Sequence, residues 1–112
     1  MKIKSWREIP IISNPHNLDI RELYDNPQIQ IRQVILRPGE RVRPFLSPIN
    51  AILYVNSGSV IVQSGDLIKP AIEGELIICP ADKPTNLYNN SNSKSLIIAI
   101  RAPKPTIRSL LL

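Results

Sequence analysis

Short apolar runs separated by turn-forming residues follow one another through most of this chain. Residues 28–37 begin with strict alternation of polar and apolar side chains and then become continuously apolar, which is typical of a half-buried β-strand. Isoleucine-rich runs at 49–55 and 95–101 favour strands as well. Eleven prolines would break any long helix. The pattern therefore predicts an all-β protein.

Glycine, proline and asparagine mark the turns between these runs, as at Pro38-Gly39 and Asn56-Ser57-Gly58. Short strands with closely spaced turns indicate a sandwich or a small barrel. The length of 112 residues suits a single domain. We expect an N-terminal arm at 1–27, a barrel at 28–101 and a C-terminal tail at 102–112. Further strands are expected at 40–47, 59–63, 67–72, 76–79 and 86–88, and residues 18–24 favour a strand over a helical turn.

Composition narrows the class of function. The net charge is +5, but the basic residues are dispersed and aromatic residues make up only 4% of the chain, so nucleic acid is not an expected partner. A single cysteine excludes an internal disulfide. Neither a signal-peptide core nor an apolar run of the ~20 residues that a membrane span needs is present. We therefore expect a cytoplasmic location without membrane association.

Two stretches carry glycine, proline and asparagine at a distinctive spacing. In the first, Gly39 is followed by five residues, then by Phe45-Leu46-Ser47, by Ala51 and by Gly58. In the second, Gly74 is followed by five residues, then by Pro80-Ala81-Asp82, by Thr85 and by Asn89. Over residues 28–101 this spacing resembles the two motifs of the cupin family. The resemblance implies a cupin-like double-stranded β-helix, which is a jelly-roll barrel.

The metal-binding positions of that family are all changed. In cupins two histidines, a glutamate and a later histidine converge on one metal ion, and the matching positions are Phe45, Ser47, Ala51 and Thr85. None of these side chains is a ligand for the transition metals that cupins hold, which prefer imidazole, thiolate or carboxylate. We therefore expect neither a metal site nor another cofactor.

Strand alternation extends the inward face that the resemblance implies. Arg43, and with it Arg41, shares the parity of Phe45 and is expected at the rim of the barrel. This arrangement predicts a pocket for a small, partly apolar ligand with an anionic group, bound by Arg43 and lined by Phe45, Ser47, Cys79 and Thr85. The alternative is a barrel that its own side chains fill completely. The other positions expected to face inward are Leu53, Val55, Ile77 and Leu87.

No catalytic residue is predicted. Cys79 lies in an apolar strand, where burial keeps a thiol protonated and inert. His16 lies between two turn-forming residues of the N-terminal arm, so a loop histidine is favoured over a general base. Tyr54 and Tyr88 have outward parity and suit packing or an interface.

Three hypotheses for the function remain open. The first is a metal-free, non-catalytic domain that binds a small molecule or acts as a sensor or accessory subunit. The second is a metal-independent isomerase or epimerase that uses His16, a tyrosine and Arg43, so whether the protein is an enzyme stays uncertain, with the balance against. The third is a structural interaction protein. In each case we expect a homodimer, because the outward positions Ile52, Tyr54, Leu76 and Ile78 are apolar.

Overall fold

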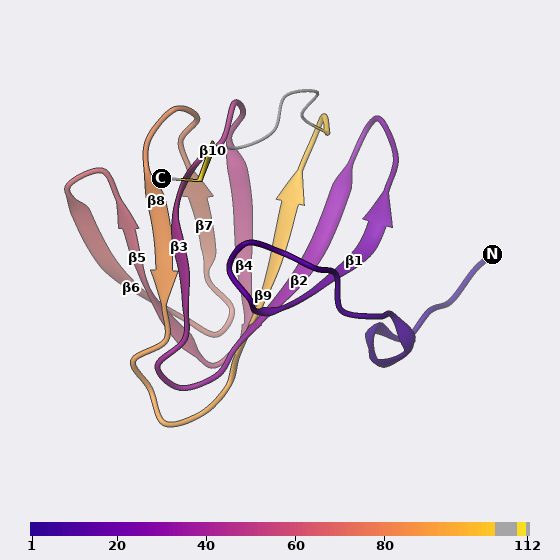
Figure 1. The fold of residues 1–112 in the computed structure, drawn as a ribbon, viewed down its shortest axis with the longest axis horizontal. Coiled ribbons are helices and arrows are strands. Elements are labelled where there is room, and N and C mark those ends of the chain that lie inside the picture. Colours follow the sequence, from indigo (N-terminus) through magenta and orange to yellow (C-terminus); the bar gives the residue numbers. More distant parts are fainter. Residues whose placement is uncertain (105–109, 112) are drawn as a thin grey trace.

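The computed structural model describes residues 1–104 and 110–111 as two facing antiparallel sheets (Figure 1). A three-residue 3-10 helix, Trp6–Glu8, precedes them. The order of the first sheet is β1 (Asp19–Asp25), β2 (Gln30–Leu36), β9 (Ser95–Arg101), β4 (Ala51–Ser57) and β7 (Leu76–Cys79). The order of the second is β10 (Leu110–Leu111), β3 (Arg41–Leu46), β8 (Thr85–Tyr88), β5 (Ser59–Ser64) and β6 (Leu67–Ile72). The all-β prediction is confirmed.

Strands that follow one another in the sequence are divided between the two sheets. Among the described strands, the β1–β2 and β5–β6 pairs are joined by short hairpins within one sheet. The other connections run from one sheet to the other. This is the jelly-roll pattern, and it buries one face of each sheet against the other. The strand predicted at 18–24 is β1, which pairs with β2 and adds a strand to the first sheet.

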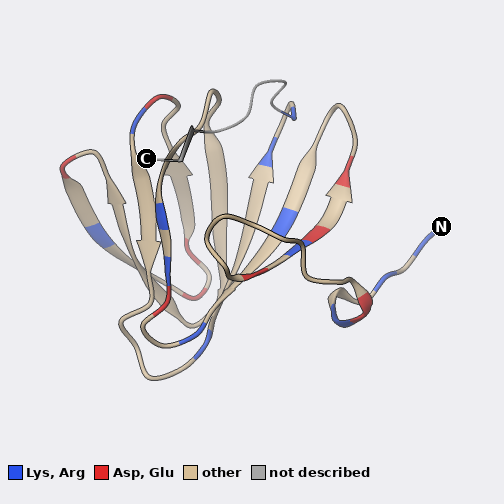
Figure 2. Cartoon of the chain, viewed as in Figure 1, with Lys and Arg blue, Asp and Glu red and all other residues tan. Residues whose placement is uncertain are grey.

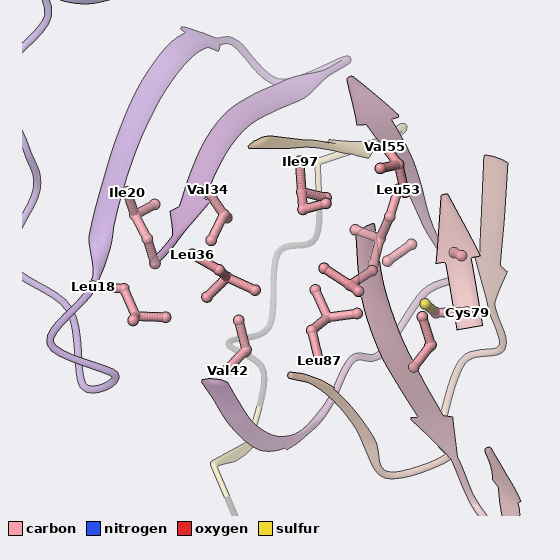
Figure 3. Packing of buried hydrophobic residues seen from close by; sticks show 14 residues of the cluster. Leu18, Ile20, Val34, Leu36, Val42, Leu53, Val55, Cys79, Leu87 and Ile97 are labelled. Atoms are coloured by element: carbon pink, nitrogen blue, oxygen red, sulfur yellow. The ribbon is translucent and has the colours of Figure 1, made fainter. Parts of the chain in front are cut away.

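The core lies between the sheets and is built by residues that alternate along each strand (Figure 3). Leu36, Val55, Val60 and Ile97 are completely buried. The inward parity predicted for β4 and β8 is confirmed, since alternate residues there are buried and their neighbours are not. Other members of the core are Leu18, Ile20, Val34, Val42, Ala51, Leu53, Val62, Ala71, Cys79 and Leu87.

The parity predicted for β3 is wrong at its start. Val42 is buried while Arg41 and Arg43 are exposed, and the register against β8 shifts between Val42 and Phe45. Pro44 lies between these two residues. The pairing is irregular there because proline cannot donate a hydrogen bond to the neighbouring strand. The guanidinium of Arg41 therefore stacks over the ring of Tyr88, 5.1 Å from its centroid, on the outer face.

Two motif residues have structural roles. Gly58 has a φ of +78°, and a Cβ there would lie 2.7 Å from the Lys94 carbonyl oxygen, so only glycine fits. Asn89 is fully buried, and its amide donates 2.8 Å hydrogen bonds to the carbonyl oxygens of Leu36 and Ser93. Gly58 forms the turn between β4 and β5, which belong to different sheets, and Asn89 connects the end of β8 to the end of β2 in the other sheet. Their positions in these connections explain why their spacing indicates the fold.

The two open edges of the sandwich are treated differently. One edge, which we call the β1/β3 edge, is formed by β1 and by the part of β3 before Phe45, which the two-residue strand β10 does not pair with. There residues 12–18 cross from one sheet to the other: the amide of Ile12 donates to the carbonyl oxygen of Ile20 at 2.8 Å, and the amide of Arg43 donates to Nδ1 of His16 at 3.1 Å. At the β6/β7 edge the Glu73-Gly74 turn and the β7–β8 loop connect the sheets. Among the described residues, no helix has the length and apolarity that a membrane crossing requires.

The outer face of the first sheet is apolar over β9, β4 and β7, as the sequence predicted for β4 and β7. Ile52 and Tyr54 are 37% and 38% exposed on β4, and Leu76 and Ile78 are 57% and 65% exposed on β7. Cross-strand pairing places Ile52 beside Ile78 and Tyr54 beside Leu76. These four residues, together with the half-buried Ile98 and Ile100 of β9, form one surface, which we call the outer apolar face. The homodimer that this surface suggests stays a prediction.

Candidate functional site

A cavity of about 330 Å³ opens between the two sheets at the β6/β7 edge. Its walls are mainly apolar, and they come from β5, β6, β7 and the β7–β8 loop. Pro70, Leu76 and Ile78 have outward parity, so the space reaches the edge of the outer apolar face. The volume falls within the range of small-molecule sites, which begins at roughly 300 Å³. The lining residues are Val62, Ser64, Leu67, Lys69, Pro70, Ala71, Glu75, Leu76, Ile77, Ile78, Pro80 and Lys83.

The shape of the cavity follows from the short, interrupted edge strands. Pro70, on β6, stands opposite Ile61 of β5. Because β6 is an edge strand that pairs with β5 alone, the missing amide hydrogen of Pro70 is tolerated there. The inward residues of β6 are Leu67, Lys69 and Ala71, and only Ala71 is buried. Among the described strands none lies beyond β6 or β7, so the inward side chains at this edge are not covered by a further strand and a hollow remains.

Two lysines line this cavity and supply its positive charge. Lys69 lies at an inward position of β6, opposite Val62, and Lys83 lies in the β7–β8 loop. Figure 2 shows the basic segments on β6 and on this loop at the same side of the molecule. In the part of the chain that the structure describes, neither lysine forms an ion pair with a carboxylate.

The loop that holds Lys83 is anchored at three points. The amide of Ala81 donates to Oδ1 of Asn50 at 2.7 Å, and the amide of Asp82 donates to the carbonyl oxygen of Ser47 at 3.0 Å. The hydroxyl of Thr85 donates to the carbonyl oxygen of Lys83 itself at 3.2 Å. These bonds hold the backbone in place while leaving the ammonium group exposed.

Glu75 is the one carboxylate among the lining residues, and it already serves the turn. Its Oε1 accepts the amide hydrogen of Ile72 at 2.8 Å, and its own amide donates to the carbonyl oxygen of Ile72 at 3.0 Å. The lining thus carries two positive charges and one negative charge.

The hydroxyl of Ser64 is the unexplained polar group of the site. Its oxygen is buried and has no hydrogen-bond partner in the described structure, although it belongs to a residue of the cavity wall. Leaving such a group unpaired costs about 1–3 kcal/mol. A ligand atom inside the cavity could satisfy it.

None of the five residues that we predicted to bind a ligand lines this cavity. Ser47, Cys79 and Thr85 are buried, Phe45 is half-buried against the core, and Thr85 stands opposite both Phe45 and Ser64 in its sheet. Their role in ligand binding stays a prediction. Sequence reasoning missed Lys69 and Lys83. The signal for Lys69 was its parity, because it alternates with the inward residues Leu67 and Ala71.

Arg43 lies at the opposite edge of the second sheet. Its guanidinium donates to the carbonyl oxygen of Pro15, and its backbone amide donates to Nδ1 of His16. Partial burial, followed by the charge of Arg43, lowers the pKa of His16 below its usual value near 6.5. Through the hydrogen bond that Nδ1 accepts from the Arg43 amide, His16 connects the N-terminal arm to β3.

The thiol of Cys79 is buried at the end of β7. Burial raises its pKa to about 11. Because the thiolate is the nucleophilic form, this thiol is chemically inert at neutral pH.

The side chains at the positions of the cupin ligands do not fit a transition metal. Ser47, Ala51 and Thr85 are buried and Phe45 packs against the core, so the positions do face the interior as expected. Phenyl, methyl and hydroxyl groups do not replace imidazole and carboxylate. Over residues 1–104 and 110–111, no three His, Cys, Asp or Glu side chains gather in one place.

A cluster of polar side chains that was not predicted from the sequence lies on β1 and β2, at the other edge of the first sheet. The guanidinium of Arg32 pairs with the carboxylate of Glu22, and the amide of Gln30 lies 3.5 Å from the same carboxylate. Burial, and then the charge of Arg32, lowers the pKa of Arg101. Glu22 and Arg32 face each other across β1 and β2, so the cluster supports strand pairing.

No protein-family model and no curated protein matches this sequence. Solved structures do match its fold. The polyketide cyclase RemF from Streptomyces resistomycificus is similar with a TM-score of 0.85 at 17% identity, covering 100% of this chain and 85% of its own. An RmlC-like cupin from Shewanella frigidimarina has a TM-score of 0.80 at 14% identity, covering 95% and 94%.

A third match is a sugar phosphate isomerase from the cupin superfamily of Silicibacter pomeroyi, with a TM-score of 0.77 at 16% identity, covering 93% of this chain and 77% of its own. Their identities to this chain are all below 20%, so the likeness is one of fold. The two facing five-stranded sheets and these matches together show that the chain has a double-stranded β-helix fold like that of solved cupin structures.

Proposed function

We propose that this protein is a non-catalytic, metal-free binding domain that holds a small molecule in the cavity at the β6/β7 edge. The observation that supports this proposal is the cavity itself, about 330 Å³ with apolar walls and an unpaired Ser64 hydroxyl. The buried side chains fill the interior between the sheets, and this space lies at the edge of the sandwich, among residues that are mostly exposed.

The isomerase alternative requires an acid or base beside the ligand. His16 contacts β3, and β8 and β5 separate β3 from the cavity strand β6. Three strand spacings of roughly 4.8 Å place His16 about 14 Å from β6. Direct proton transfer needs about 3 Å, so His16 does not act on a molecule bound in this cavity.

The experiment is a titration of the ¹⁵N-labelled protein with 1-decanol, an uncharged apolar probe, followed by NMR. We expect saturable shifts at the amides of Leu67, Ala71 and Ile77, which lie on both walls. The variant Leu67→Trp, which narrows the opening, should lose these shifts. Ile68→Trp is the matched control, because Ile68 is 62% exposed on the same strand and has the opposite parity.

Shifts that persist in Leu67→Trp, or that appear only at residues remote from β6 and β7, would contradict the proposal. Saturation in the wild type and in Ile68→Trp alone would support it. Circular dichroism of each variant verifies that the fold is retained.

We also propose that two copies associate through the outer apolar face. None of its six residues is charged, so two chains that each carry a net charge of +5 can approach there without bringing like charges together. A two-fold pairing would place the same apolar residues on both sides of the contact. Sedimentation velocity should detect a dimer that Ile52→Lys dissociates and that Ile68→Lys, outside the face, leaves intact. A monomeric wild type would refute this part.

A further inference from the structure

We infer that the cavity selects amphipathic anions, molecules with an apolar body and one carboxylate or phosphate head group. This inference rests on the proposed binding function and names the class of ligand. Three observations carry it: the apolar walls, the two lysines in the lining, and the unpaired hydroxyl of Ser64.

The walls determine the apolar body. Val62, Ala71 and Ile77 present only hydrocarbon to the interior, and Leu67 extends this surface to the opening. Burial of hydrocarbon against such walls is favourable at roughly 25 cal/mol per Å². A ligand made of polar groups alone would find too few partners here, because the side-chain polar groups of the lining are limited to Ser64, Lys69, Glu75 and Lys83.

The lysines determine the sign of the head group. Lys69 and Lys83 approach the cavity from different elements, β6 and the β7–β8 loop, and both are exposed at the solvent side. The carboxylate of Glu75 opposes them, but it is already bound to the backbone of the turn and offsets only one of the two charges. An anionic head at the opening is therefore favoured over a cationic one.

Ser64 adds a hydrogen bond for the same head group. It stands opposite Leu67 at the opening and opposite Thr85 on β8, and the amide of the neighbouring Gly65 donates to the carbonyl oxygen of Pro84, next to Lys83. A hydroxyl donates as well as accepts, and it can therefore pair with an oxygen on the ligand.

The experiment compares decanoate, 1-decanol and acetate by isothermal titration calorimetry at pH 7.5. We expect decanoate to bind about tenfold more tightly than 1-decanol, since two exposed ammonium groups contribute modestly to an anion. Acetate, which has the head group alone, should bind undetectably. Added salt should weaken decanoate binding and leave 1-decanol unaffected.

Variants connect the selectivity to the residues. Lys69→Gln combined with Lys83→Gln should reduce decanoate affinity about tenfold and leave that of 1-decanol unchanged. Lys94→Gln is the control, because Lys94 is exposed in the β8–β9 loop and absent from the lining. Ser64→Ala should weaken decanoate binding by a few-fold.

The outcomes distinguish the binding function from the class of ligand. Equal affinity for decanoate and 1-decanol would overturn the ligand class and leave the binding function standing. Binding of neither compound would overturn the binding function. A preference for decanoate that survives the double lysine substitution would overturn the roles given to Lys69 and Lys83.

Discussion

The two edges of this sandwich are closed to very different degrees. At the β1/β3 edge, residues 12–18 span the gap, and Leu18 and Ile20 are buried in the core. At the β6/β7 edge, Leu67, Leu76 and Ile78 remain more than half exposed around the cavity. The same two sheets thus form a sealed side and an accessible side. The difference shows that the N-terminal segment, which covers one edge and not the other, decides which edge of the described structure is left open.

The largest expected difference concerns two isoleucines on opposite edge strands. Ile20→Ala removes a side chain that is 6% exposed, and we expect it to lower the free energy of unfolding by about 3 kcal/mol. Ile78→Ala, at a site 65% exposed, should cost less than about 1 kcal/mol. Urea denaturation at low protein concentration, which limits any contribution from association, measures both. Equal losses would show that the two edges are packed alike.

Cys79 tests how far the accessible side extends into the core. Its pKa of about 11, against an ordinary 9.0, should reduce the thiolate fraction at pH 8 by about 100-fold. Labelling by iodoacetamide, followed by intact mass spectrometry, should be correspondingly slower in the native protein than in urea. Native labelling at the unfolded rate would mean that the cavity reaches the thiol.

Asn14 is expected to be the main polar support of the sealed side. Its amide donates 2.9 Å hydrogen bonds to the carbonyl oxygens of Ile12 and Leu18, and its Oδ1 accepts from the amides of His16 and Leu18. Asn14→Ala should therefore lower the free energy of unfolding by about 2 kcal/mol, because these backbone groups lose their partner. Asn90→Ala, at an exposed position, is the control and should have little effect. Thermal unfolding of the three proteins gives the comparison.

The smallest expected effect is a dependence on pH that arises from His16. Its pKa is lowered in the folded state, so as the pH falls below about 6.5 the unfolded chain takes up a proton that the folded chain resists. Protonation of Nδ1 would also remove the acceptor for the Arg43 amide. The free energy of unfolding should decrease between pH 7.5 and pH 5.

The control for this effect is His16→Gln, which cannot titrate. Its free energy of unfolding should decrease less than that of the wild type over the same interval. Parallel pH profiles for the two proteins would exclude a contribution from His16.

The sequence alone determined every described strand except β10, which lies in the expected C-terminal tail, and most of the inward faces. Alternation along β4 and β8 predicted Leu53, Val55 and Leu87 in the core, because side chains of a strand point to opposite sides in turn. The spacing of Gly58 and Asn89 indicated the fold, since each position tolerates little besides the residue that occupies it.

Only the tertiary structure decided where the open space lies. Alternation reports which face a residue occupies, but not whether another layer of side chains covers it. Arg43 was expected at the rim from the sequence and Lys69 was not considered, yet the N-terminal segment covers the edge at Arg43 and nothing described covers the edge at Lys69. The irregularity at Pro44 also changed the orientation of Arg41. Such packing depends on contacts between residues far apart in the chain, and local patterns of polarity carry no record of it.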